Sequence, residues 1–175
     1  MREYDAKIAQ IYRAGCRAWL VGFRRPAGLG RRRRCRRFGH RLEDTKYTLQ
    51  DGLKASEREG QPISAQFEID DGKLQLSIYT TKGDEFIEIV ADPTSGAIMK
   101  SQRITDNDDL NDAGEQKAAM AKATVSLLAA ADAAVKDNAG SRVVGIFPEL
   151  TDGHAVAEVT LLQGTTAKKV TEKLE

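Results

Sequence analysis

Hydrophobic and polar residues alternate along several short stretches of the chain after residue 42, and this period of two is typical of half-buried β-strands. Turn signals separate the stretches. The Asp71-Gly72 pair supplies the positive φ angles of a tight hairpin, and Pro93 suits the second position of a β-turn. We therefore expect a meander of antiparallel strands over residues 63–69, 74–78 and 86–90, with a short fourth strand starting at residue 97.

A helix is expected ahead of this meander, over about residues 49–59. Thr48 is a suitable N-cap, and Asp51 stands three residues after it, where an acidic side chain can complete a capping box. Gly60 can end the helix in a left-handed conformation, and Pro62 prevents its continuation.

A second, Ala-rich helix is expected over about residues 113–138, with Asp112 and Glu115 as its capping pair. The polar and acidic stretch from Ser101 to Asp112 has the composition of a linker. We expect the small side chains of this helix to allow close packing on a sheet, and an interaction face is the alternative.

The order of elements then repeats. Strands are expected at residues 143–147, 155–161 and 167–171, with Pro148 ending the first of them and Asp152-Gly153 forming the hairpin turn. Helix, strand, Asp-Gly turn, strand, turn and strand thus occur twice, over roughly 46–104 and 119–175, and the second copy lacks the fourth strand.

These patterns predict an α+β fold of two repeats, each a helix packed on a small antiparallel β-sheet, with a disordered basic N-terminal extension. Units of about 60 residues are marginal alone, so we expect the two to pack together. The expected division is an Arg-rich extension outside the fold (1–41), a first repeat (45–104), a linker with a helix start (105–118) and a second repeat (119–175).

The charge distribution changes this picture at the N-terminus. Residues 1–41 hold 12 Arg and 1 Lys against 2 acidic residues, a net charge of +11, whereas residues 42–175 carry a net charge of −10. Both cysteines, Cys16 and Cys35, and the tryptophan Trp19 also lie in the first segment. Such a composition break indicates a boundary near Leu42.

Three interpretations of the Arg-rich segment remain open. Arg pairs with phosphates in a bidentate way, so the run at residues 31–37 could be a nucleic-acid-binding arm. A solvated, disordered tail is the second interpretation. The third, which we favour, is that residues 1–41 are a signal peptide translated in the wrong reading frame.

The frame hypothesis rests on codon usage. If most third codon positions are C, a shift of one nucleotide turns residues 31–41 into seven Ala followed by Ser-Ala-Thr-Ala. An Ala-rich stretch ending in small residues just before Leu42 is what a signal-peptidase site looks like. The working protein would then be periplasmic or secreted, whereas a chain that is translated as given would be cytoplasmic.

The segment Asp71–Lys100, DGKLQLSIYTTKGDEFIEIVADPTSGAIMK, resembles the PepSY domain, a family of peptidase propeptides and exported bacterial proteins. That family shows a helix, a strand, D-G-K, a second strand, and a third strand that runs into V-D-P-x-T-G-x-V. Here one residue is added between Val90 and Asp92, and Ser95 separates Thr94 from Gly96. The second copy keeps the Asp-Gly turn but has no D-P-x-T-G turn, and both copies together cover about 115 residues.

The resemblance implies a small α+β fold with one helix on an antiparallel sheet. It also implies a non-catalytic role, often the inhibition or modulation of peptidases outside the cytoplasm.

The residues themselves give few candidates for chemistry. His154 has no Cys or His partners of the kind that zinc sites need, so a surface position in a turn is expected for it. The stretch Asp106–Asp112 fails the EF-hand pattern, because its sixth position is Asn111 and its twelfth is Lys117. A solvated linker is expected there, and weak calcium binding in an exported setting is the alternative. We expect no catalytic residue, cofactor or metal, and the sequence names no binding residue.

The expected function is therefore that of a non-enzymatic, exported PepSY-like protein that binds peptides or proteins and modulates a peptidase. The alternatives are a nucleic-acid-binding protein that uses residues 1–41, and a structural or ligand-sensing module of the cell envelope. No apolar run is long enough for a transmembrane helix. Exposed strand edges are the expected partner surface.

Overall fold

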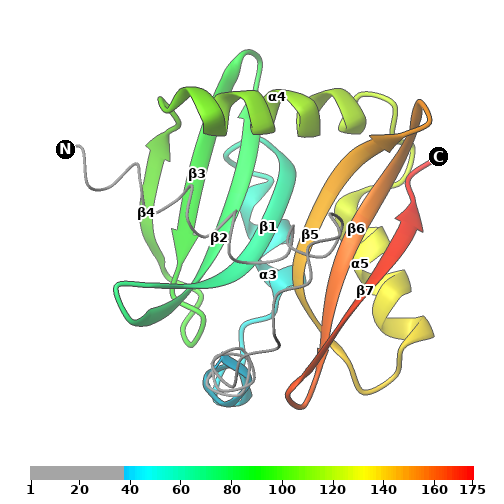
Figure 1. The fold of residues 1–175 in the computed structure, drawn as a ribbon. Helices are drawn as coiled ribbons and strands as arrows, with labels where there is room; N and C mark the ends of the chain where they lie inside the picture. Colours follow the sequence, from blue (N-terminus) through cyan, green and yellow to red (C-terminus); the bar gives the residue numbers. More distant parts are fainter. Residues whose placement is uncertain (1–37) are drawn as a thin grey trace, which may run out of the picture.

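The computed structural model describes residues 38–175, and the predictions made for residues 1–37 lie outside this part of the chain. The described residues form a mixed α and β fold around one seven-stranded antiparallel sheet (Figure 1). Its strand order is β4-β3-β2-β1-β5-β6-β7. Both halves of the chain contribute to this single sheet, and the finer prediction of two helix-on-sheet repeats stays a prediction.

The first half of the sheet is the expected meander. Its strands are β1 (Gln61–Asp70), β2 (Lys73–Lys82), β3 (Glu85–Ala91) and β4 (Ile98–Arg103). The hairpin between β1 and β2 closes with positive φ at both Asp71 (45°) and Gly72 (76°), which matches the right-handed twist of the strands.

The strands of the second half start at a constant number of residues after their counterparts in the first half. Its strands are β5 (Arg142–Thr151), β6 (His154–Gln163) and β7 (Thr166–Lys173), so β5, β6 and β7 begin 81 residues after β1, β2 and β3. The turn φ angles repeat too, at Asp152 (52°) and Gly153 (82°). The register irregularity between Pro62 and Ser64 in β1 has its counterpart between Val143 and Gly145 in β5.

Two helices cover one face of the sheet, namely α3 (Leu49–Ser56) and α5 (Leu127–Asp137). The expected capping box of α3 is confirmed, with Thr48 accepting from the Asp51 amide and Asp51 accepting from the Thr48 amide. Gly52 lets α3 approach the sheet closely, since a Cβ at this position would lie 2.5 Å from the Leu76 side chain. The core therefore lies between these helices and the alternating apolar residues of both halves.

A third helix, α4 (Asn107–Met120), packs on the opposite face at one end of the sheet (Figure 1). The buried Ser64 hydroxyl on β1 donates a hydrogen bond of 2.7 Å to the Gln116 side chain of α4. The Lys117 ammonium lies 5.7 Å from the centre of the Phe86 ring on β3. α4 leads from β4 to the second half of the chain and packs against β1, β5 and β6, so it lies across the junction between the two halves of the sheet.

The predictions of a linker over Ser101–Asp112 and of one helix over 113–138 are wrong. Strand β4 and the first turn of α4 occupy the expected linker. The Asp106 side chain, rather than an Asp112–Glu115 pair, caps the helix by accepting from the Asp108 and Asp109 amides. Acidic residues in a first turn favour the helix because its N-terminus carries partial positive charge.

The Ala-rich segment breaks into α4 and α5 at residues 121–126 for a tertiary reason. The amides of Thr124 and Val125 both donate to the Leu174 carbonyl, at 2.7 and 2.9 Å. Ser126 then caps α5 by accepting from the Ala129 amide. Contacts with Leu174, the residue that follows β7, thus override the helix propensity of the segment.

Two smaller predictions are also wrong. Gly60 has no positive φ and does not end α3, which stops at Ser56. It is needed for close approach, because a Cβ there would lie 2.7 Å from the Thr81 carbonyl oxygen. Pro148 does not end β5, which continues to Thr151. Pairing of β5 with β1 stops at Ile146, so the missing N–H of Pro148 costs no hydrogen bond to β1.

The boundary expected at Leu42 is shifted. Residues 38–43 are helical, Leu42 is buried, and Phe38 packs against the core, so residues 38–41 belong to the described fold. Arg142 holds the chain that follows. Its guanidinium donates to the carbonyls of Leu42 (2.7 Å) and Tyr47 (2.6 Å), and thereby joins β5 to the approach to α3.

Candidate binding surfaces

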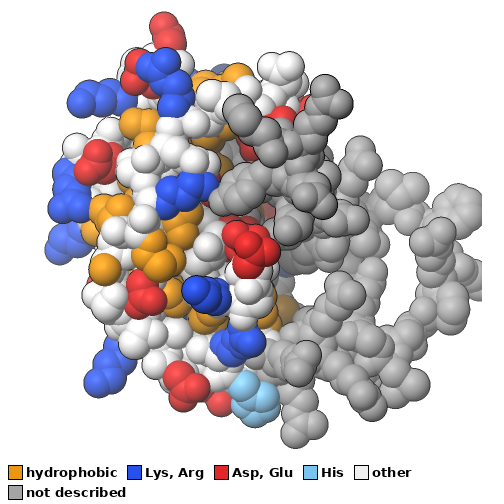
Figure 2. Space-filling view, turned by 90° about the vertical axis from the view of Figure 1, so that its left-hand side faces the viewer, with side chains coloured by type: hydrophobic (Ala, Val, Ile, Leu, Met, Phe, Trp, Pro, Cys, Tyr) orange, Lys and Arg blue, Asp and Glu red, His pale blue; other side chains and the backbone are white. Residues whose placement is uncertain are grey.

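The two edge strands of the sheet, β4 and β7, differ in chemistry. β4 is largely exposed and carries the apolar side chains of Ile98 (37% exposed) and Met99 (56% exposed). Figure 2 shows the side of the molecule on which β4 lies, where hydrophobic side chains are interspersed with charged ones. β7 is exposed as well, and its outward residues are mostly polar and basic.

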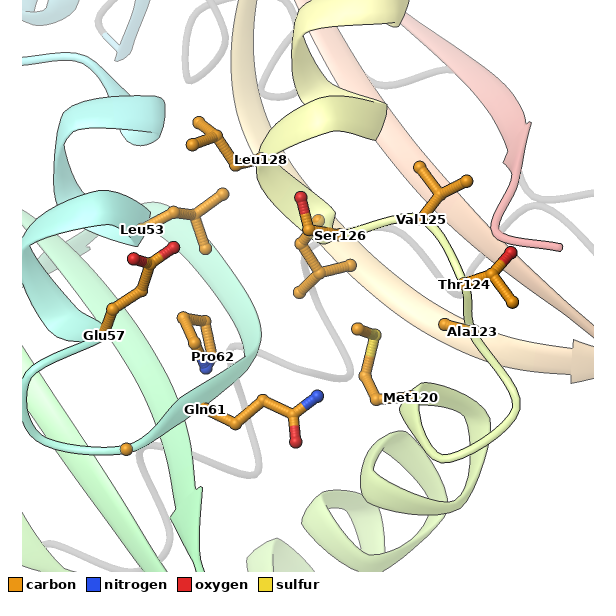
Figure 3. A pocket seen from close by; sticks show the side chains of 12 residues that line it. Leu53, Glu57, Gln61, Pro62, Met120, Ala123, Thr124, Val125, Ser126 and Leu128 are labelled. Atoms are coloured by element: carbon orange, nitrogen blue, oxygen red, sulfur yellow. The ribbon is translucent and has the colours of Figure 1, made fainter.

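A pocket of about 400 Å³ lies between α3, the start of β1 and the connection from α4 to α5. In Figure 3, Leu53 and Pro62 face Met120 and Val125 across it, and Glu57 lies beside Leu53. The full lining comprises Leu53, Glu57, Gly60, Gln61, Pro62, Met120, Ala123, Thr124, Val125, Ser126, Leu127 and Leu128. A space of this size and apolar character can hold one large side chain of a partner, with a carboxylate nearby.

The sequence did not indicate this pocket, because the residues of one wall were expected inside a continuous helix. Residues 121–126 form that wall only because the helix breaks there. The signal that could have located the break is the run Thr124-Val125-Ser126, which combines two β-branched residues with a good N-cap.

A hydrogen-bonded polar cluster lies on the sheet face opposite α3. Ser77 donates to Glu68 at 2.5 Å and Gln75 donates to the same carboxylate oxygen at 2.9 Å. Burial raises the pKa of Glu68, and the hydrogen bonds from Ser77 and Gln75 oppose that rise. The cluster therefore holds the Glu68 carboxylate on hydrogen-bond donors from the neighbouring strand β2.

A second acidic group lies where α4 meets β3. Gln102 donates to Glu88 at 3.0 Å, and the Lys100 ammonium lies 3.5 Å from it. Burial of Asp109, together with the charges of Asp106 and Glu88, raises the pKa of Asp109 to about 6. Among residues 38–175, no cluster of three or more His, Cys, Asp or Glu side chains is arranged to hold a metal ion.

His154 is exposed (75% of its side chain), and its Nδ1 lies 2.9 Å from the Glu175 carboxylate. The expectation of a surface histidine beside a turn is confirmed. The stretch Asp106–Asp112 is the start of α4 and not a solvated linker, with Asp106 engaged as the N-cap.

No helix within the described residues is both long and apolar enough to cross a membrane.

Comparisons with known proteins give little further information. No protein-family model matches the chain, and no curated protein matches it. Among solved structures, the chain is similar to a putative lipoprotein from Clostridium difficile 630. The identity is 12% and the TM-score 0.42, and the similarity covers 75% of this chain and 88% of that one. A similarity this distant carries no conclusion about fold or function.

Proposed function

We propose that this protein is an exported, non-enzymatic binding protein built from two PepSY-like repeats, and that it restrains a peptidase outside the cytoplasm. The observation that carries the proposal is the constant spacing of 81 residues between equivalent strands. It supports a duplicated unit, and the first copy of that unit bears the PepSY-like sequence.

The pairing at the centre of the sheet supports the duplication independently. Ala65 of β1 pairs with Ile146 of β5, and these two residues are themselves 81 positions apart. Two copies of one unit that join edge to edge about a two-fold axis would bring equivalent residues together at that axis. An unrelated pair of half-domains has no reason to meet in this register.

Geometry also favours binding as the role. The sheet ends in two exposed edge strands, and unpaired backbone N–H and C=O groups on such edges can accept an added strand. The pocket beside α3 adds a place for an apolar side chain. A peptidase fits this geometry, because its substrate cleft binds extended chain segments such as an exposed edge strand.

Export is the remaining part of the proposal and depends on the reading frame of residues 1–41. The segment after Leu42 carries no cysteine, which is compatible with an oxidising compartment. The acidic net charge of this part does not favour binding to a nucleic-acid backbone.

The test is an inhibition assay with the full chain and with peptidases purified from the exported fraction of the native cells. We expect at least one peptidase to be slowed in a dose-dependent and saturable manner. Bovine serum albumin at equal mass serves as a control for competition by protein substrate. Unchanged rates for all of them would overturn the peptidase assignment and leave a structural or ligand-sensing module as the surviving alternative.

A further inference from the structure

Strand β7 occupies, in the second half, the position that β3 occupies in the first. The outer edge of β3 is covered by β4, through the pairs Glu88–Gln102 and Val90–Lys100. In the described part of the chain no strand pairs with the outer edge of β7. The first half therefore shows what kind of occupant the position beside β7 accepts, namely one antiparallel strand of about six residues.

The comparison of β7 with β3 also shows which backbone N–H and C=O groups of β7 point away from β6. On β3, the Phe86 carbonyl accepts a hydrogen bond of 2.9 Å from the Ile104 amide, so Phe86 directs its backbone groups away from β2. In an antiparallel strand these outward groups recur at every second residue. At the spacing of 81, the outward residues of β7 are Ala167, Lys169 and Thr171.

Two of the three lysines of β7, Lys168 and Lys169, do not block this edge. The Lys168 ammonium donates to the Asn138 side chain at 2.7 Å, and the Lys169 ammonium donates to Glu158 on β6 at 2.5 Å. Both side chains thus extend back over the sheet faces. A lysine that protects an edge strand instead keeps its charge in the path of an incoming strand.

Charge defines the chemistry of the occupant. In the first half the added strand is opposite in charge to the strand that it covers: Lys100 of β4 lies 3.5 Å from Glu88 of β3, and Arg103 of β4 pairs with Glu85 of β3. At the position that corresponds to Glu88, β7 carries Lys169. β7 holds three lysines and one glutamate, so the same rule requires an acidic strand.

We infer that the outer edge of β7 is a strand-addition site for an acidic, extended segment of a partner protein. This inference rests on the proposed binding function and names its surface and the chemistry of its ligand. Backbone hydrogen bonds would supply affinity, and the net positive charge of β7, which holds three lysines and one glutamate, would supply selectivity.

The test uses two synthetic peptides that differ only in charge. One has the sequence of residues 96–104, GAIMKSQRI, and the other has the same sequence with K100E and R103E. Each is titrated into the full ¹⁵N-labelled chain, and amide shifts are followed by NMR. We expect the acidic peptide to shift Ala167, Lys169 and Thr171 and to bind at least about tenfold more tightly than the basic one.

Two variants of the chain complete the test. Thr171→Pro removes an outward N–H without touching the bonds to β6, and is expected to abolish binding while the fold persists. Lys169→Glu is expected to reverse the preference between the two peptides, a result that a merely destabilised strand would not give. Circular dichroism of both variants checks that the sheet is intact.

Several outcomes would overturn the inference. The first is equal affinity for both peptides, and the second is a set of amide shifts confined to β4 or to the pocket. The third is protection of the outward β7 amides from hydrogen exchange in the free chain. Such protection would indicate that the chain itself or a second copy already covers this edge. Failure of the proposed function is distinguishable. If Thr171→Pro loses the peptide but still restrains a peptidase, only the β7 site is wrong; if the peptide binds and no peptidase is restrained, only the peptidase assignment is wrong.

Discussion

Ala65 of β1 pairs with Ile146 of β5 at the centre of the sheet, and each residue is the counterpart of the other at a spacing of 81. Both side chains are fully buried. The pairing makes one continuous apolar surface out of two halves that would each be too small to form a stable core. It also leaves the outermost strands, β4 and β7, as the two ends of the sheet.

The turn at Gly96 is expected to tolerate no side chain. Gly96 has a φ of 72°, and a Cβ there would lie 2.5 Å from the Tyr47 ring. Gly96→Ala should therefore cost about 2–3 kcal/mol in the free energy of unfolding, from backbone strain and from the clash. Gly72→Ala is the matched control, since Gly72 has a φ of 76° with nothing within 4 Å, and should cost about 1 kcal/mol. Equal losses in urea denaturation would show that the contact with Tyr47 is unimportant.

Arg142 is expected to be the most sensitive charged residue of the fold. Its guanidinium donates to three carbonyls, those of Leu42, Thr45 and Tyr47, and lies 5.1 Å from the centre of the Phe67 ring. Arg142→Ala should lower the free energy of unfolding by about 3 kcal/mol, because the partly buried carbonyls lose their donors. Arg142→Lys should recover little of this, since an ammonium cannot span the three acceptors.

Arg58→Ala provides the control for charge removal. Arg58 is exposed and lies 3.4 Å from its neighbour Glu59, an arrangement that contributes little to stability. Its loss should change the free energy of unfolding by less than about 0.5 kcal/mol. A similar effect for Arg58→Ala and Arg142→Ala would contradict the role given to the three carbonyl contacts.

The contribution of Asp109 to stability is expected to fall as the pH rises from about 4 to about 6. The pKa of Asp109 is raised from 3.8 to about 6 in the folded chain, so within this window the folded state binds a proton that the unfolded state has released. The loss attributable to Asp109 is about 1 kcal/mol once solvent screening is allowed for. Asp109→Asn should flatten this part of the profile. Denaturation curves at pH 4 and pH 7 give the free energy of unfolding at each pH. The assignment would be contradicted if the difference between these two values were the same for Asp109→Asn as for the parent chain.

The strands could be predicted from the sequence because their signals are local. Alternating side chains and Asp-Gly turns fix a hairpin within about 20 residues, and both hairpins formed as expected. The helices in the middle of the chain could not be predicted in the same way. The break at residues 121–126 depends on the Leu174 carbonyl, some 50 residues away, and no local pattern contains that contact.

The sequence predicts that the sheet has exposed edge strands, but it does not predict which strands these are. Exposed edges follow from any open sheet, but which strands form them depends on the pairing of β1 with β5, and that pairing involves only two residue pairs. The charge contrast between β3 and β7 is present in the sequence as Glu88 and Lys169. This contrast indicates a difference between equivalent strands only when the spacing of 81 residues is known, because that spacing makes Glu88 and Lys169 counterparts.

The frame hypothesis predicts that the native protein lies in an exported fraction and starts near Leu42, without the contact that Phe38 makes with the core. Intact mass and N-terminal sequencing of protein from the native cells would test this expectation. A start at Met1, with the full mass of 19.2 kDa in the cytoplasm, would instead make the Arg-rich segment part of the working protein. The nucleic-acid-binding alternative would then become the leading one, and its affinity should fall steeply with salt.

The most direct test of the proposed role is the extracellular peptidase activity of the native cells with the gene intact, deleted and restored. The account predicts that deletion raises this activity, that the restored gene lowers it again, and that a restored gene encoding Thr171→Pro lowers it less. Identical activity in the intact and deleted cells would contradict the proposal that this protein restrains a peptidase.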